Sequence, residues 1–196
     1  MPNWCENIMT INNIFDEAKA KEIQEALRGP DSPPYYVPPA HQTTGSYDSN
    51  NQIIPGESDL SFQKLIPVPK HILMSAHPNY KHDGIANQLP TYEWGTKWSP
   101  IDVDVVEVGN ELIYYFSTAW GPPLPVVKKI SELFPEVEVE IKYMELGNLF
   151  AGKTTYVNGL ETESEEVLDD IDELETFAIE EMGYDEQFFE DMGYRD

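Results

Sequence analysis

The segment IDVDVVEVGNELIYYFS, residues 101–117, decides the fold. Ile101, Val103 and Val105 alternate with aspartates, which is the pattern of a strand with one buried face. Gly109–Asn110 supplies a two-residue turn, and the apolar run after it predicts the returning strand of a β-hairpin. The sequence therefore predicts an antiparallel pair of strands in the middle of the chain.

The segments on either side of this hairpin each predict a strand and a helix. Residues 5–12 alternate as a strand, and residues 16–27 form an amphipathic helix that Gly29–Pro30 ends. Residues 126–134 have helical spacing and stop before a proline, and residues 136–146 alternate again. The order strand, helix, loop, strand, strand, helix, strand is the split βαβ, or ferredoxin-like, arrangement. We therefore expect an α+β fold, an antiparallel sheet with two helices on one face.

The predicted domain covers residues 1–159 and contains a long loop insertion at about 28–60. That insertion is rich in proline and then in serine, asparagine and glutamine, so no regular element is expected in it. A helix or an irregular stretch is expected over residues 72–88, and an edge strand over residues 150–157.

Residues 160–196 are expected to form an acidic tail that is helical or disordered. They carry sixteen acidic residues and one basic residue, and the whole chain has a net charge of −24. Apolar residues at helical spacing predict one amphipathic helix from Ser164 to Met182, with Ser164 as its N-cap. Two near-repeats follow, Glu-Met-Gly-Tyr at 181–184 and Asp-Met-Gly-Tyr at 191–194.

This charge limits the partners that the chain can bind. Nucleic-acid binding depends on Lys and Arg displacing counterions, so direct DNA or RNA binding is disfavoured. A concentrated negative field favours a basic protein partner, and a host protein that handles nucleic acid has such a surface. The alternative is that the charge only keeps the protein soluble. Eight residues of the tail are the candidates for partner binding: the aromatic anchors Tyr184, Phe188, Phe189 and Tyr194, and the carboxylates Glu181, Asp185, Glu190 and Asp191.

A second candidate site is a pocket lined by tryptophans. Stacking on tryptophan would suit a flat ligand, and a buried carboxylate beside it would suit acid–base chemistry. The same residues are more typical of core packing next to tight glycine turns. The candidate pocket residues are Trp94, Trp98, Trp120, Tyr143 and Glu145.

Other motifs favour binding over catalysis. Cys5 is the single cysteine, and a cysteine within a strand is typical of a small buried residue rather than a nucleophile. The histidines have no zinc-site spacing, so we expect neither a metal nor a cofactor. Pro2 could serve as an N-terminal base, but no cationic residue lies near it. Gly147–Thr154 matches the letters of a phosphate-binding loop, yet an alternating strand precedes it and a β-rich run follows.

The cellular location follows from the cysteine and from hydropathy. One cysteine cannot form an intramolecular disulfide, which fits a reducing compartment. No apolar run reaches the roughly 20 residues of a membrane span, and the N-terminus is unlike a signal peptide. We expect a cytoplasmic protein that does not associate with membranes.

Several short motifs, in this order, resemble those of one family. They are Met1-Pro2-Asn3-Trp4-Cys5-Glu6-Asn7, Leu65-Ile66-Pro67-Val68-Pro69, Trp94-Gly95-Thr96-Lys97-Trp98, Phe116-Ser117-Thr118-Ala119-Trp120-Gly121-Pro122-Pro123, Phe134-Pro135, and Tyr143-Met144-Glu145-Leu146-Gly147 with Phe150-Ala151-Gly152. The chain resembles the YubB-like family of uncharacterised phage and plasmid proteins over residues 1 to about 157. This resemblance implies a ferredoxin-like domain and a mobile-element origin, and it leaves the acidic tail outside the family pattern. It implies no activity and no catalytic residue.

Two hypotheses from different classes follow. The leading one is an acidic protein-binding module that occupies the basic site of a host nucleic-acid-binding or defence protein, as a DNA mimic. The alternative is a small enzyme or ligand-binding domain that uses the tryptophan-lined pocket.

Overall fold

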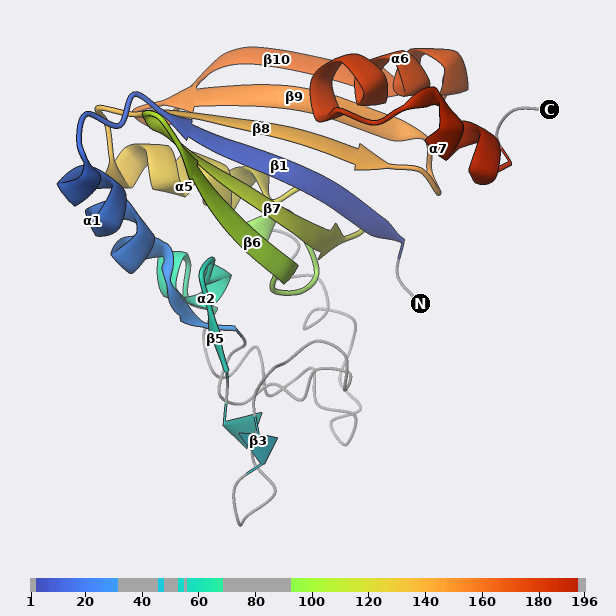
Figure 1. Ribbon diagram of the computed structural model, residues 1–196. Helices are drawn as coiled ribbons and strands as arrows, with labels where there is room; N and C mark the ends of the chain where they lie inside the picture. Colours follow the sequence, from blue (N-terminus) through green and yellow to red (C-terminus); the bar gives the residue numbers. More distant parts are fainter. Residues whose placement is uncertain (1–2, 32–45, 48–52, 55, 69–92, 194–196) are drawn as a thin grey trace.

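A six-stranded antiparallel sheet forms the frame of the chain, with the strand order β10-β9-β8-β1-β7-β6 (Figure 1). The computed structural model describes residues 3–31, 46–47, 53–54, 56–68 and 93–193. The sheet strands are β1 (Trp4–Asn12), β6 (Ile101–Val108), β7 (Glu111–Ala119), β8 (Glu138–Glu145), β9 (Phe150–Val157) and β10 (Leu160–Leu168). The helices are α1 (Glu17–Leu27), α2 (Phe62–Leu65), α5 (Leu124–Leu133), α6 (Ile171–Met182) and α7 (Glu186–Asp191).

Four neighbouring strands, β8-β1-β7-β6, confirm the predicted ferredoxin-like arrangement. They are connected in the chain order β1-α1-β6-β7-α5-β8, which is the expected split βαβ pattern. The predicted hairpin joins β6 to β7 through Gly109–Asn110, with Val108 paired to Glu111. The α+β class and the antiparallel sheet are therefore as predicted from the alternating segments.

The larger hydrophobic core lies under the sheet face that α1 and α5 cover (Figure 1). On α1, Ala20, Ile23 and Leu27 are buried, and the side chain of Asp16 accepts a hydrogen bond from the Lys19 amide as the N-cap. On each strand every second side chain points to this face, as Val139 does on β8. We call this face, covered by α1 and α5, the first face, and its core the first core.

Short elements occupy part of the segment that was predicted to be a long loop. β2 (Gly29–Pro30) pairs with β5 (Glu57–Ser58), and β3 (Ser46–Tyr47) pairs with β4 (Ile53–Ile54). The expectation that no regular element fits in residues 28–60 is therefore wrong in part, because these strands are too short to give an alternating pattern. The helix or irregular stretch expected over residues 72–88 lies outside the described residues.

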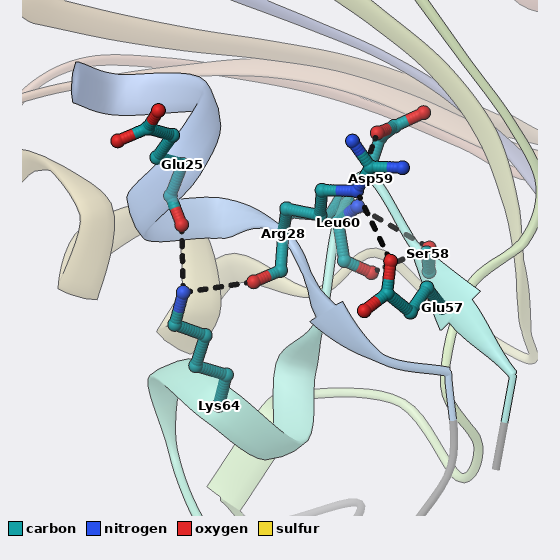
Figure 2. Close-up of polar contacts among 7 residues, drawn as sticks. All are labelled: Glu25, Arg28, Glu57, Ser58, Asp59, Leu60 and Lys64. Carbon is teal, nitrogen blue, oxygen red and sulfur yellow. Dashed lines mark hydrogen bonds and ion pairs between the residues drawn. The ribbon is translucent and has the colours of Figure 1, made fainter. Parts of the chain in front are cut away.

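Lys64 fixes α2 against the end of α1, as Figure 2 shows. Its Nζ donates to the backbone carbonyls of Glu25 at 2.7 Å and Arg28 at 2.8 Å, where α1 ends and its last carbonyls lack helical partners. Arg28 Nε lies 3.6 Å from a carboxylate oxygen of Glu57 and 3.6 Å from one of Asp59. This polar cluster stabilises the edge of the first core.

The residues after Gly159 continue the main sheet. Asn158 and Gly159 have φ angles of 49° and 74°, which suit the tight turn of a hairpin, and β10 pairs antiparallel with β9 along its length. The single helix predicted from Ser164 to Met182 is therefore wrong in its first part. Residues 160–168 form a strand, and α6 begins at Ile171 with Asp170, not Ser164, as its N-cap.

The helices α6 and α7 pack on the second face of the sheet, opposite α5 (Figure 1). Because side chains alternate along a strand, Met144 and Ala151 point to this face, whereas their neighbours point to the first. Leu174, Phe177 and Ala178 of α6 pack on them in a smaller second core. The second face bears exposed apolar side chains on β6 and β7, where Val106 is 40% exposed and Tyr115 is 42% exposed.

Candidate functional site: an acidic groove between β10 and α6

A groove of about 470 Å³ lies between the edge strand β10 and helix α6. Val167 and Phe177, both part of the second core, supply its apolar lining. Carboxylates from both elements surround it, together with the hydroxyl of Thr176. The carboxylates are Glu165 of β10 and Asp172, Glu173, Glu180 and Glu181 of α6.

Local structure fixes the positions of these carboxylates. The side chain of Asp170 accepts hydrogen bonds from the backbone amides of Asp172 at 3.0 Å and Glu173 at 3.1 Å, which holds the first turn of α6 beside β10. Asp172, Thr176 and Glu180 are four residues apart, so they lie along one side of the helix. Acidic residues in a first turn are also favoured by the helix dipole. The acidic side of α6 is therefore compatible with a stable helix.

Glu181 is the member of this cluster that cations neutralise most directly. Its carboxylate lies 2.8 Å from Lys142 Nζ and 3.2 Å from Lys153 Nζ, on strands β8 and β9. The hydrogen bond from Lys142 is the largest of the effects that lower the pKa of Glu181. Burial alone would lower the pKa of Lys153, but its hydrogen bond to Glu181 and nearby carboxylates outweigh burial and raise that pKa. Glu181 therefore joins α6 to the sheet.

The remaining carboxylates of the groove keep most of their charge unbalanced. A carboxylate oxygen of Glu165 lies 4.0 Å from the Nζ of Lys153, and this lysine also pairs with Glu181. Within the described ranges, Asp172, Glu173 and Glu180 form no ion pair, and all three are exposed. A groove with an apolar lining and exposed carboxylates suits the long side chain of Lys or Arg, which has an apolar stem and a charged end.

A second, open groove of about 380 Å³ lies on the second face near the link between α6 and α7. The Tyr184 hydroxyl donates a hydrogen bond to the carboxylate of Glu6 on β1, and burial raises the pKa of Glu6. Tyr115 and Asp102 also line this groove. The contact fastens the end of α6 to the central strands.

The residues predicted to bind a partner lie largely in the α6–α7 region, in different environments. Phe189 is fully buried in the second core, and Tyr184 and Phe188 pack against that core, so these rings stabilise the fold itself. Asp185 is the N-cap of α7 and accepts from the Phe188 amide at 3.0 Å. Asp191 accepts from the side-chain amide of Gln187 at 3.0 Å, and Glu190 is exposed. Tyr194 lies outside the described residues.

The residues predicted to line a pocket lie in several different environments. Trp94 is buried in the first core, where its Nε1 donates to the Ile66 carbonyl at 2.8 Å, and Trp98 packs against the ring of Trp4. Trp120 is 48% exposed in a turn with a φ angle of 75°. The tryptophans thus occupy three different environments.

Tyr143 and Glu145 lie near Cys5. Tyr143 covers Gly152, where a Cβ would lie 2.5 Å from the tyrosine oxygen, and burial raises its pKa to about 12. Glu145 is 1% exposed and accepts hydrogen bonds from the amides of Gly147 at 2.5 Å and Asn148 at 3.1 Å. Glu145 therefore stabilises the turn between β8 and β9.

Other motifs take structural positions. Cys5 is a free, buried thiol, and burial, with the Glu145 carboxylate, raises its pKa, so it is a poor nucleophile. Residues 147–154 form a turn and the first half of β9, so they lack the helix that a phosphate-binding loop opens. The four histidines and Pro2 lie outside the described residues. In the ranges that are described, no group of three His, Cys, Asp or Glu could hold a metal ion.

Sequence reasoning did not identify the groove as a site. The sequence predicts Asp172, Glu173 and Glu180 only as part of the acidic tail, and its predicted helix from Ser164 to Met182 includes Glu165. The signal that could have found the groove is Asn158–Gly159, which is a strong hairpin pair and predicts a strand after it.

The fold and this site define a ferredoxin-like α+β domain whose sheet is extended by two strands at one edge and carries an acidic groove there. Residues 90–192 match the family described as the ferredoxin-like domain in Api92-like protein. The chain belongs to this family. The matched region contains residues 160–192, so most of the acidic segment lies inside the pattern of this family.

A crystal structure of the protein api92 from Yersinia pseudotuberculosis is similar to this chain in fold. The similarity covers 87% of this chain and 99% of that one, with a TM-score of 0.51 and 12% sequence identity. No protein with a curated description matches the chain. In the described part of the chain, no helix is long and apolar enough to cross a membrane.

Proposed function

We propose that this protein is an acidic binding module that occupies the basic site of a protein that handles nucleic acid. The observation that carries the proposal is the groove between β10 and α6, where the carboxylates of Asp172, Glu173 and Glu180 are exposed and form no ion pair with any described residue. All three lie on α6, and the N-cap of Asp170 and the contacts of Glu181 with the sheet hold this helix in place, so a partner meets a preorganised surface.

The charge of the whole chain supports the same function. A net charge of −24 gives long-range attraction to cationic surfaces and repulsion from nucleic acid. A partner that normally neutralises phosphates with Lys and Arg can neutralise these carboxylates instead, and the protein then acts as a DNA mimic. Mimicry of this kind would inhibit a host nucleic-acid-binding or defence protein by competition.

A mobile-element origin and a cytoplasmic location belong to the same proposal. The resemblance of residues 1–157 to a family of phage and plasmid proteins supports the origin, and a single buried cysteine fits a reducing compartment. A product of a phage or plasmid gains from blocking host proteins that act on its DNA.

The test is affinity capture from a host lysate with the full chain as bait. One bait is the groove variant, Asp172→Asn with Glu173→Gln and Glu180→Gln. The control bait neutralises Asp104, Glu107 and Glu17, which are one aspartate and two glutamates, exposed and without ion pairs in the described region. Both variants have the same net charge, so they differ only in where the charge is lost.

We expect the parent and the control to retain a basic protein that the groove variant loses. High salt and added duplex DNA should both release it, because the contact is ionic and the DNA competes for the same surface. Retention that is indifferent to salt, or a captured protein that duplex DNA does not displace, would overturn the mimicry proposal.

A further inference from the structure

The outer edge of β10 is a free sheet edge that lies next to the groove. Among the described residues, β10 has β9 as its one strand neighbour. Half of the backbone N–H and C=O groups of such a strand point away from the sheet and can pair with another chain. A register shift between Glu161 and Glu163 disturbs the beginning of the strand, so Glu163–Leu168 is its regular part.

We propose that this edge accepts an extended Lys- or Arg-rich segment of the partner as a seventh strand. The proposal rests on the proposed function. It adds that the partner's segment is extended and that its backbone pairs with the backbone of β10. Strand addition combines main-chain hydrogen bonds, which supply affinity, with alternate side chains, which supply specificity.

Carboxylates occupy both faces of this edge. The pairing of β10 with β9 sets Glu163 and Glu165 opposite Thr155 and Lys153 on the second face. Glu166 pairs with Gly152, so it points to the first face. A strand added beside β10 would therefore place cationic side chains next to carboxylates on either face.

The groove gives the second face an additional role. A side chain of the added strand that points to this face enters the space between β10 and α6. Its aliphatic stem can lie on Val167 and Phe177, and its charged end can reach Asp172 or Glu173. This arrangement fits Lys or Arg and excludes a short or acidic side chain.

Charge also identifies the occupant. Acidic residues on an edge strand repel a second copy of the same strand, which is a common protection against aggregation. A second copy of a chain with a charge of −24 is therefore disfavoured, and a cationic segment is favoured. The opposite edge strand, β6, exposes the apolar side chains of Val106 and Val108, and none of its residues lines the acidic groove.

The test uses a synthetic decapeptide of alternating lysine and threonine and the full-length protein at low ionic strength. In an extended strand, alternate residues direct their N–H groups to the same side. Two further peptides carry N-methyl groups, one on every lysine and one on every threonine, with the charge unchanged. We expect the parent peptide to bind, and one N-methylated peptide to bind as well as the parent while the other loses about tenfold or more in affinity.

Two further measurements locate the binding. Amide hydrogen exchange of Glu163–Leu168 should slow when the peptide binds, because unpaired edge amides become hydrogen-bonded. Glu163→Lys with Glu166→Lys should lower peptide affinity about tenfold or more, whereas the exposed β6 control Glu107→Lys should change it by less than about threefold.

The outcomes separate this inference from the proposed function. If both N-methylated peptides bind as tightly as the parent, the backbone is not used, and strand addition is wrong while an acidic binding surface remains. If the parent peptide fails to bind but a DNA-displaceable protein is captured, strand addition is again wrong and the function stands. If the peptide binds with the expected pattern and no captured protein is displaced by DNA, mimicry fails and the strand site stands.

Discussion

The two faces of the sheet are built differently. Among the described residues, the first core contains 22 buried residues, including side chains of α1 and α5, and the second core contains seven, including side chains of α6 and α7. The acidic groove lies on the side with the smaller core, where residues 160–193 contain no lysine or arginine. The small core must therefore hold two helices against mutual repulsion of their carboxylates. The difference indicates that the first core supplies stability, whereas the elements around the second core present charge.

The largest expected effect is in the first core. Ile141→Ala truncates a fully buried side chain on β8, and we expect a loss of about 2–5 kcal/mol in the free energy of unfolding. Urea unfolding followed by circular dichroism measures this loss. The control is Val106→Ala on the exposed part of β6, which should change stability by less than about 0.5 kcal/mol. Equal losses for the two variants would contradict the view that the first core supports the fold.

A smaller, local effect is expected in the second core. Leu174→Ala truncates a buried residue of α6. We expect a loss of about 2 kcal/mol in the free energy of unfolding, near the lower end of the same range, because the small second core can partly collapse into the space left. Native-state amide hydrogen exchange should show faster exchange in α6 and α7 with little change in β1. Uniformly faster amide exchange in all strands would mean that the elements around the first core and those around the second core unfold as one unit.

The four ferredoxin-like strands could be predicted because each of them buries one face. Ile101, Val103 and Val105 alternate with aspartates, and that alternation is enough to identify a strand from the order of residues alone. Residues 160–168 give no such signal, since Val167 is the one buried residue of β10 and carboxylates occupy both faces. A strand exposed on both sides has no apolar period, so its acidic composition suggested a helix or a disordered tail.

The same reasoning explains what was and was not predicted in the site. The helical spacing of Leu174 and Ala178 predicts a helix, and α6 confirms it because it buries one side. The partners of Glu181 could not be predicted, because Lys142 and Lys153 become neighbours only when β8 pairs with β9. Likewise, the groove exists only because β10 joins the sheet beside α6.

The ion pairs of Glu181 should stabilise the packing of α6 on strands β8 and β9. Glu181→Gln leaves Lys142 and Lys153, which are paired across β8 and β9, without their shared carboxylate. We expect a loss of about 1 kcal/mol at neutral pH, typical of a partly exposed network. Urea unfolding measures it, and Glu180→Gln, which removes an exposed carboxylate without a described ion pair, is the control.

The pH dependence gives this prediction its sign. The pKa of Glu181 is lowered from its ordinary value of 4.5, so its contribution is complete above pH 4.5 and disappears as the pH falls through the lowered pKa. The stability curves of the parent and Glu181→Gln should therefore converge in acid. Parallel curves below pH 4.5 would mean that the pairs do not stabilise the fold.

The smallest expected effect concerns the contact between Tyr184 and Glu6. Tyr184→Phe removes the hydroxyl that donates to the Glu6 carboxylate, and we expect a loss of about 0.5 kcal/mol because the contact is exposed. The groups around the open groove partly desolvate the Glu6 carboxylate and already raise its pKa, and the loss of a donor to its ionised form should raise that pKa further. A carboxyl-carbon NMR titration of Glu6 in both proteins measures the shift, with Tyr115→Phe on the same open groove as the control. If the Glu6 titration is unchanged in Tyr184→Phe, the hydroxyl does not bind Glu6 in solution, and the second core and the Glu181 ion pairs hold α6 and α7 on the sheet without it.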